Sequence, residues 1–172
     1  MLKKLIVTAC LLSLAIGAAW AGDAKKEAAH GAAGAEHMQA MMSEMLKCSV
    51  CKNMAPAMAE IGPSMTMDVA HLNDGVAMMH GVTDPSKVAV FHAASAAMQK
   101  AGAACATMTD EQVKTELCGF CQGMHSAIKA GAKMSMGMTK MGDIMVLTSS
   151  DPAVKAQIDE LAKQCEMMAG SM

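Results

Sequence analysis

The chain has 172 residues, among them 22 Met and 7 Cys, whereas only 2% of its residues are aromatic. All of its 14 basic residues are Lys, and 16 acidic residues bring the formal net charge to -2 at pH 7. This balance excludes the basic surface of a nucleic-acid-binding protein. A hydrophobic content of 53% excludes a disordered acidic tail. The length suits one ordinary domain or two small ones.

The first 21 residues have the pattern of a secretory signal peptide. Two lysines precede an apolar run over 5–17, and Ala19-Trp20-Ala21 has the small-x-small form of a cleavage site. The run is at the short end for crossing a bilayer, which disfavours a membrane anchor. We therefore expect an exported protein, periplasmic or secreted, with no membrane segment after cleavage. Residues 22–36 are rich in Ala, Gly and Lys and are expected to form a flexible leader.

The remaining sequence contains two copies of one pattern. In each copy, a Cys-x-x-Cys motif followed three residues later by Met precedes a segment of alternating Met and then a Ser/Thr-Asp-Pro sequence. The aligned segments are 48–54 and 118–124, 64–67 and 133–136, and 83–85 and 150–152. Because their order and spacing agree, we predict two repeat units, 37–105 and 106–172, that together form one duplicated domain.

Each unit is predicted to begin with one continuous helix. In the second unit, Thr109-Asp-Glu-Gln112 has the form of a capping box, and apolar residues follow it at helical spacing as far as Ile128. The equivalent helix of the first unit is expected to span about 37–60.

A β-hairpin is predicted after each of these helices. Methionines alternate with small or polar residues in 65–70 and 134–139, and 73–75 and 142–143 have the composition of turns. The alternation predicts that these methionines face the core. Because an isolated hairpin is only marginally stable, we expect both hairpins to share one four-stranded antiparallel sheet.

Each unit is predicted to end in a second helix, with Thr83 and Ser150 as N-caps and Pro in the first turn. The fold class is therefore α+β, with two tandem helix–hairpin–helix units whose helices cover one shared sheet. The residues expected to be buried along the final helices are Val88, Phe91, Ser95 and Met98, and Val154, Ile158, Leu161, Cys165 and Met168.

The two Cys-x-x-Cys motifs are the strongest chemical signal. Such a pair can form a redox disulfide, hold a soft metal ion or have a structural role. Neither motif is followed by His, which excludes covalent attachment of a c-type haem. The predicted helices place both pairs in mid-helix, which disfavours thioredoxin-like catalysis because that chemistry uses a helix N-terminus. A zinc site would require the two pairs to come together.

Cys105 and Cys165 close the final helices and bring the cysteines of the exported chain to six. An even number of cysteines in an exported protein is typical of a disulfide framework, whose connectivity the sequence leaves open. One scheme joins Cys48 or Cys51 to Cys105, and Cys118 or Cys121 to Cys165.

Methionine and histidine supply further candidate ligands, since the thioether is a soft ligand suited to Cu(I). Methionines of the predicted strands are explained by the core, so those near the ends of the ordered region are better ligand candidates: Met38, Met41, Met42, Met167, Met168 and Met172. His125 follows Cys118 and Cys121 at spacings that place all three on one helical face. The predicted metal ligands are Cys48, Cys51, Met54, Cys118, Cys121, Met124 and His125.

No phosphate-binding glycine loop, nucleophile elbow or His-Glu-x-x-His motif occurs, so we predict no catalytic residue and favour a protein that is not an enzyme. The favoured function is an exported soft-metal-binding protein, a Cu(I) buffer or chaperone whose partner is the metal ion. Two alternatives stay open: a disulfide-stabilised, non-catalytic structural or interaction module of the periplasm, and a thiol–disulfide oxidoreductase. The sequence names no protein partner.

Overall fold

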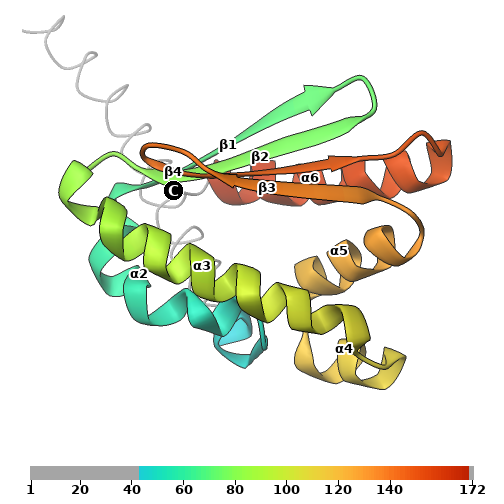
Figure 1. Cartoon of the computed structure of the whole chain (residues 1–172), viewed down its shortest axis with the longest axis horizontal. Coiled ribbons are helices and arrows are strands. Elements are labelled where there is room, and N and C mark those ends of the chain that lie inside the picture. The colour runs from blue at the N-terminus through green and yellow to red at the C-terminus, as the bar shows by residue number, and fades with distance from the viewer. Residues whose placement is uncertain (1–42, 171–172) are drawn as a thin grey trace, which may run out of the picture. The chain divides into compact units, whose positions relative to one another are not determined.

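The two predicted hairpins lie side by side in one antiparallel sheet. The structure, a computed structural model, describes residues 43–170. The strands are β1 (Met65–Leu72), β2 (Gly75–Val82), β3 (Lys133–Met138) and β4 (Gly142–Thr148), in the spatial order β1-β2-β4-β3 (Figure 1). Met78 and Met145 pair at the centre. The predicted α+β class and shared four-stranded sheet are confirmed, while the duplication of one unit stays a prediction.

Along the chain, the helices lie before, between and after the two hairpins. Residues 43–47 are helical, and the longer helices are α2 (Ala55–Ile61), α3 (Val88–Ala104), α4 (Asp110–Glu116), α5 (Gly119–Lys129) and α6 (Pro152–Ala169). Short 3-10 helices connect them: η1 (Cys51–Asn53), η2 (Gly62–Ser64), η3 (Pro85–Lys87) and η4 (Cys105–Thr107). All the described residues belong to one unit that spans 41–172.

Two glycines allow the hairpins to join. Gly75 and Gly142 begin the two central strands, β2 and β4. A Cβ atom at Gly75 would collide with the backbone of Leu147, and a Cβ atom at Gly142 would collide with the backbone of His80. The central strands therefore approach each other closely because both positions lack a side chain.

α3 and α6 cover the same face of the sheet. α6 packs on β1 and β2, where its Val154 and Ile158 are buried in the main core, and α3 packs on β2 and β4, where Phe91 is buried with Val82. Figure 1 shows α2, α3, α4 and α5 on one side of the sheet. The burial predicted for the final helices is confirmed, because Val88, Met98 and Met168 are half-buried and the other listed residues are buried.

The N-caps of these two segments lie one residue beyond the predicted positions. The carboxylate of Asp84 accepts a hydrogen bond from the backbone N–H two residues ahead at 2.9 Å, and that of Asp151 does the same at 2.7 Å. Thr83 and Ser150 are therefore the wrong caps. A charged carboxylate is a stronger acceptor for the exposed N–H groups of a helix start than the hydroxyl before it.

Both predicted continuous helices are broken at their cysteines. The capping box of Thr109 and Gln112 is present, but α4 ends at Glu116 and α5 begins only at Gly119. Leu117 between them is extended (φ −111°, ψ 143°) and only 5% exposed, so burying this side chain turns the chain out of the helix. The helix predicted over 37–60 is likewise divided into the segment 43–47, η1 and α2, and its part before residue 43 lies outside the described residues.

The methionines of the two hairpins have different surroundings. Met65 and Met67 of β1 are half-buried and pack against the core, as predicted. Met134, Met136 and Met138 of β3 are 43%, 41% and 46% exposed, so their predicted place in the core is wrong. The reason is that the main helix packing falls on β1, β2 and β4, with β3 at the edge beyond it.

The predicted signal peptide, 1–21, and leader, 22–36, lie outside the described residues. Within the described part of the chain, no helix combines the length and the apolar character needed to cross a membrane. Export therefore stays a prediction from the sequence.

Candidate metal centre

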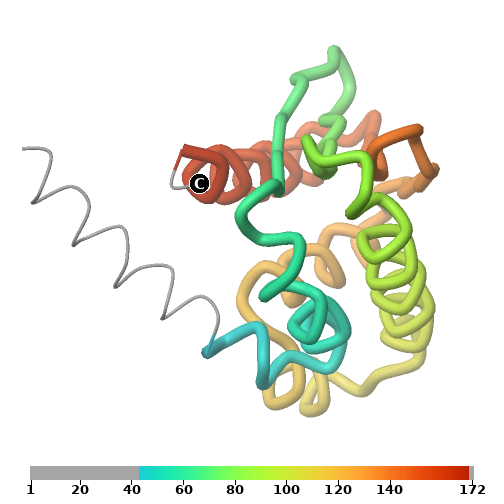
Figure 2. Tube along the Cα trace, turned by 90° about the vertical axis from the view of Figure 1, so that its left-hand side faces the viewer, coloured from blue at the N-terminus to red at the C-terminus, as the bar shows by residue number. Residues whose placement is uncertain are grey.

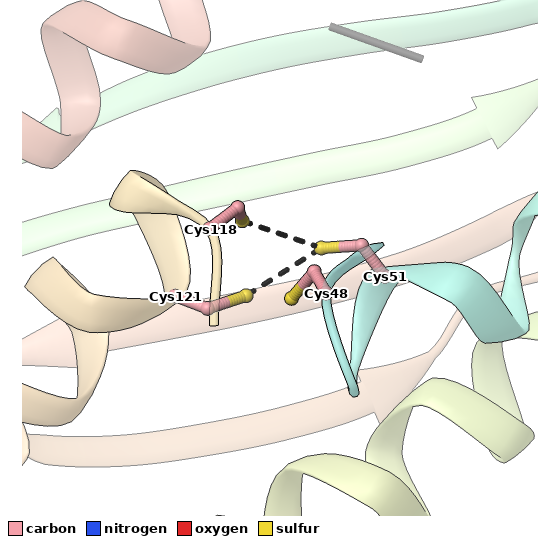
Figure 3. A group of neighbouring side chains, drawn as sticks. All are labelled: Cys48, Cys51, Cys118 and Cys121. Atoms are coloured by element: carbon pink, nitrogen blue, oxygen red, sulfur yellow. Dashed lines mark hydrogen bonds between the residues drawn. The ribbon is translucent and has the colours of Figure 1, made fainter. Parts of the chain in front are cut away.

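Four cysteines from the two Cys-x-x-Cys motifs come together in one group (Figure 3). Cys48 follows the helical segment 43–47, and Cys51 begins η1. Cys118 is the N-cap of α5, and Cys121 lies in the first turn of that helix. In Figure 2 the cyan chain after residue 42 lies beside the turn between α4 and α5, so segments about 70 residues apart meet here.

Hydrogen bonds hold the first motif against the second. The backbone N–H of Ser49 donates to the carbonyl of Glu116 at 2.8 Å, and its hydroxyl donates to the Glu116 carboxylate at 3.3 Å. The side-chain amide of Asn53 donates to the carbonyls of Ser49 and Val50 at 3.0 and 2.8 Å. The first motif is thus a tight turn, closed by Asn53 and fixed beside the end of α4.

The sulfur–sulfur distances fit a shared metal ion. All four Sγ atoms lie within 4.8 Å of one another, and the Sγ of Cys51 is 3.5 Å from that of Cys121 and 3.8 Å from that of Cys118. Four thiolates arranged tetrahedrally at about 2.3 Å from an ion have sulfur–sulfur separations of about 3.8 Å. A disulfide requires a separation of about 2.05 Å. The group therefore has the dimensions of a four-thiolate metal site.

All six cysteines in the described part of the chain are free thiols, so the expected disulfide framework is not present there. Cys105 is buried in a small cluster with Cys48, and its thiol donates to the carbonyl of Ala101 at 3.4 Å. Cys165 is buried in the main core, with its Sγ 3.2 Å from the Sδ of Met78. Both thiols fill apolar space instead of closing a loop.

Burial and charge differ among the four cysteines of the centre. Cys48 is only 1% exposed, whereas the other three are half-buried. The pKa of Cys118 is lowered because Cys121 and Cys51 donate hydrogen bonds to its thiolate. The pKa values of Cys51 and Cys121 are raised, first by their hydrogen bonds to Cys118 and also by burial. Without metal, Cys118 therefore favours the thiolate, whereas Cys51 and Cys121 favour the protonated form, and a bound ion must displace their protons.

The position of Cys118 corrects the expectation that both motifs lie in mid-helix. Because the chain turns at Leu117, Cys118 caps the N-terminus of α5. The partial positive charge of a helix N-terminus favours a thiolate at this position. The sequence disfavoured thioredoxin-like catalysis because it predicted the second motif in mid-helix. That reason no longer applies to Cys118.

The other predicted ligands pack in other clusters than the four cysteines or lie nearer the surface. Met54 is buried in the cluster around Phe91, and Met124 packs against the main core. His125 lines a shallow hollow between α4 and α5 together with Asp110 and Lys129. Met167 is 63% exposed on α6, Met168 is half-buried there, and Met38, Met41, Met42 and Met172 lie outside the described residues.

The sequence identified all four cysteines but left them as two pairs. The feature that joins them is the break at Leu117-Cys118-Gly119, where a residue that must be buried is followed by a poor helix former. The helical periodicity on both sides of this break concealed it.

The chain matches no protein-family model, no curated protein and no solved structure.

Proposed function

We propose that this chain is an exported soft-metal-binding protein that holds one ion through Cys48, Cys51, Cys118 and Cys121 and acts as a buffer or chaperone for it. The observation that carries the proposal is the approach of all four Sγ atoms to within 4.8 Å of one another. Thiolates are the protein ligands that soft and borderline ions prefer. The chain brings these four donors together from two distant segments without a disulfide between them.

Two ions suit this donor set. A tetrahedral group of four sulfurs is the arrangement typical of Zn²⁺, so the geometry favours zinc. Cu(I) is favoured by the softness of the thiolates and by the 22 methionines of the chain. Competition between the two ions for the same four cysteines decides which of them the protein carries.

The exposure of the centre favours metal handling over a purely structural role. Cys51, Cys118 and Cys121 are each half-buried, so the centre lies close to the surface, where a partner could deliver or remove the ion. A buried structural site would exchange its metal only by opening of the fold. In an oxidising compartment, the bound ion would also protect the thiolates from disulfide formation.

The test is a competition titration under anaerobic, reducing conditions, with Zn²⁺ or Cu(I) shared between the full chain and a chromogenic chelator. We expect one ion per chain at the centre and a dissociation constant of about 0.1 μM or tighter. Cys121→Ser should weaken binding by about 100-fold or more, because loss of a direct ligand costs at least as much as loss of a supporting residue. The matched control is Cys105→Ala, which removes a neighbouring buried thiol and should leave the affinity unchanged.

Two results would refute the metal-binding function. One is binding no tighter than about millimolar. The other is an affinity that the Cys121→Ser substitution leaves unchanged.

Thiol–disulfide exchange is the second candidate, and Cys118 is the observation that favours it. Its place at a helix N-terminus and its lowered pKa are the properties of an attacking thiol. An oxidoreductase should reduce insulin disulfides and lose this activity in Cys118→Ser but keep it in Cys48→Ser. Equal loss in both variants, or no activity in the metal-free wild type, excludes this candidate.

A further inference from the structure

An amide side chain closes the first Cys-x-x-Cys motif from within. The side-chain amide of Asn53 donates to the carbonyls of Ser49 and Val50, the two residues between the cysteines, at 3.0 and 2.8 Å. An amide nitrogen carries two N–H donors, so one side chain can hold both carbonyls at once. The turn between Cys48 and Cys51 is therefore fixed by hydrogen bonds that involve neither sulfur atom.

A second amide holds the chain break that precedes the other motif. The side-chain amide of Gln122 donates to the carbonyl of Leu117 at 2.8 Å and, over a longer 3.4 Å, to that of Lys114. The last carbonyls of a helix lack a partner within the helix, and α4 ends at this point. Gln122 thus ties the end of α4 to the first turn of α5, and the turn between them sets the position of Cys118.

The two turns are joined to each other by Ser49 and Glu116. The backbone N–H and the hydroxyl of Ser49 both donate to Glu116, at 2.8 and 3.3 Å. None of these bonds involves a sulfur atom, so they do not require an ion. The Sγ of Cys51 lies 3.5 Å from that of Cys121 and 3.8 Å from that of Cys118 (Figure 3), close to the roughly 3.8 Å of a tetrahedral four-thiolate site.

We propose that Asn53 and Gln122 are positioning residues that set the spacing of the four sulfur atoms and thereby favour an ion that takes all four thiolates at once, of the Zn²⁺ class. This role rests on the metal binding proposed above. Ligands that are already in place spare the ion the cost of ordering the chain around it. Residues that orient metal ligands typically change the metal affinity by about 10–100-fold when they are replaced.

The choice of ion follows from the need to combine both motifs. Zn²⁺ prefers four ligands in a tetrahedron, so it needs both cysteine pairs at a fixed distance from each other. Cu(I) is selected by the softness of thiolates, and each motif alone already offers it a pair of them. Loosening either turn should therefore weaken the binding of Zn²⁺ more than the binding of Cu(I).

The test compares Asn53→Leu and Gln122→Leu in the full chain. Leucine is close in size to both amide side chains and removes their donors without adding a ligand. Competition with a chromogenic chelator under anaerobic, reducing conditions gives the Zn²⁺ and Cu(I) affinities. Each substitution should weaken Zn²⁺ binding by about tenfold or more and Cu(I) binding by less. The matched control is Gln99→Leu, a half-buried amide of α3 that bonds to Ser95, and it should leave both affinities unchanged.

The thiolate-to-metal charge-transfer absorption of the Co²⁺-loaded protein separates a positioning residue from a ligand. The intensity of this absorption follows the number of bound thiolates. At saturation, Asn53→Leu and Gln122→Leu should keep the wild-type intensity, whereas Cys121→Ser should lose part of it. A lower intensity in the two leucine variants would contradict the positioning role.

The wild-type protein supplies a measurement that does not depend on how the variants fold. The side-chain amide protons of Asn53 should exchange slowly with water in the metal-free protein, and loading with Zn²⁺ should change their exchange little. Side-chain amide NMR signals of the full chain report this exchange. Protection that arises only after Zn²⁺ is added would overturn the proposal, because the turn would then be closed by the ion.

Two further results would overturn the positioning role while leaving the metal-binding function in place. One is wild-type Zn²⁺ affinity in both leucine variants. The other is an equal loss of Zn²⁺ and Cu(I) affinity, which would indicate general damage to the fold. Failure of the metal-binding function itself has a different signature, since the wild type would then bind neither ion more tightly than about millimolar, and the positioning role would fall with it.

Discussion

The Sγ of Cys51 lies 3.5 Å from the Sγ of Cys121, although the two residues are 70 positions apart in the chain. Each belongs to a different Cys-x-x-Cys motif, so neither motif is a complete site. The turn after residue 47 and the start of α5 supply half of the donors each. A metal ion bound here would add a further link between two segments that the hydrogen bonds of Ser49 to Glu116 already hold together.

Mild oxidation of the metal-free protein should link the two motifs. With a diazene-type thiol oxidant, two thiols give up two electrons and two protons to the reagent and form a disulfide. Because Cys51 is 3.5 Å from Cys121 and 3.8 Å from Cys118, we expect the first bridge to join Cys51 to one of them. Peptide mapping by mass spectrometry under non-reducing conditions identifies the bridge. Exclusive pairing within each motif is the contrary outcome, and metal-loaded protein serves as the protected control.

Metal binding should stabilise the fold by mass action. At a free Zn²⁺ concentration of about 1,000 times the dissociation constant, the free energy of unfolding should rise by about 4 kcal/mol. Urea unfolding with and without the ion measures the difference. Cys51→Ser should cut the gain to about 1.4 kcal/mol or less, because an affinity about 100-fold weaker leaves the ion at about 10 times its dissociation constant. Cys105→Ala should retain the full gain. An equal gain in both variants would place the bound ion elsewhere.

Asp143 is expected to be the most sensitive polar residue of the core. It is only 6% exposed, Ser95 donates a hydrogen bond to it, and His80 Nδ1 lies 3.1 Å from its other oxygen. Replacement by Ala removes the acceptor of the buried Ser95 hydroxyl and of the half-buried His80 ring and should cost about 3 kcal/mol of unfolding free energy. The exposed carboxylate of Asp110, paired with Lys129 at the surface, is the control and should change far less. Similar costs for the two substitutions would contradict this account.

The contribution of Asp143 should also depend on pH. Burial by itself raises the pKa of this carboxyl, but the hydrogen bonds of His80 and Ser95 and the nearby imidazoles outweigh it, so the net pKa is lowered. A lowered pKa stabilises the fold above the unfolded value of about 4, and this stability is lost as the pH falls through the folded value. The difference in urea midpoint between wild type and Asp143→Asn should therefore shrink as the pH falls from 5 to 3. A difference that grows over this range would contradict the lowered pKa of Asp143.

The close approach of β2 and β4 should make Gly142 irreplaceable. A Cβ atom there would collide with the backbone of His80, which cannot move without opening the sheet. Gly142→Ala should cost about 3 kcal/mol or more. Gly102→Ala is the control, because nothing lies within 4 Å of that site in α3, and it should stabilise the protein by about 0.5–1 kcal/mol. Thermal unfolding of the two variants checks both signs, and a tolerated Gly142→Ala would show that the strands can separate.

Much of the fold follows from local patterns in the sequence. The alternation around Met65 and Met134 and the turn residues after each segment predict both hairpins, and the poor stability of a lone hairpin predicts their shared sheet. Apolar spacing predicts which residues of α3 and α6 are buried. These features depend on residues close together in the chain, where the sequence is most informative.

The errors arise where distant segments compete for the same residues. Leu117 has helical neighbours on both sides, but its burial beside Cys48 and Cys105 overrides the local preference and ends α4. The exposure of Met136 depends on where α3 and α6 pack, which the alternation of β3 does not encode. The two cysteine pairs also meet only through tertiary packing. The sequence therefore predicted the four cysteines as ligands but not that they form one group.

X-ray absorption at the metal edge of the Zn²⁺-loaded full chain tests the central claim most directly. If Cys48, Cys51, Cys118 and Cys121 hold the ion together, the spectrum shows a single shell of four sulfur atoms at about 2.3 Å. A shell with two sulfur atoms completed by nitrogen or oxygen would contradict the account, because it would mean that one motif binds alone.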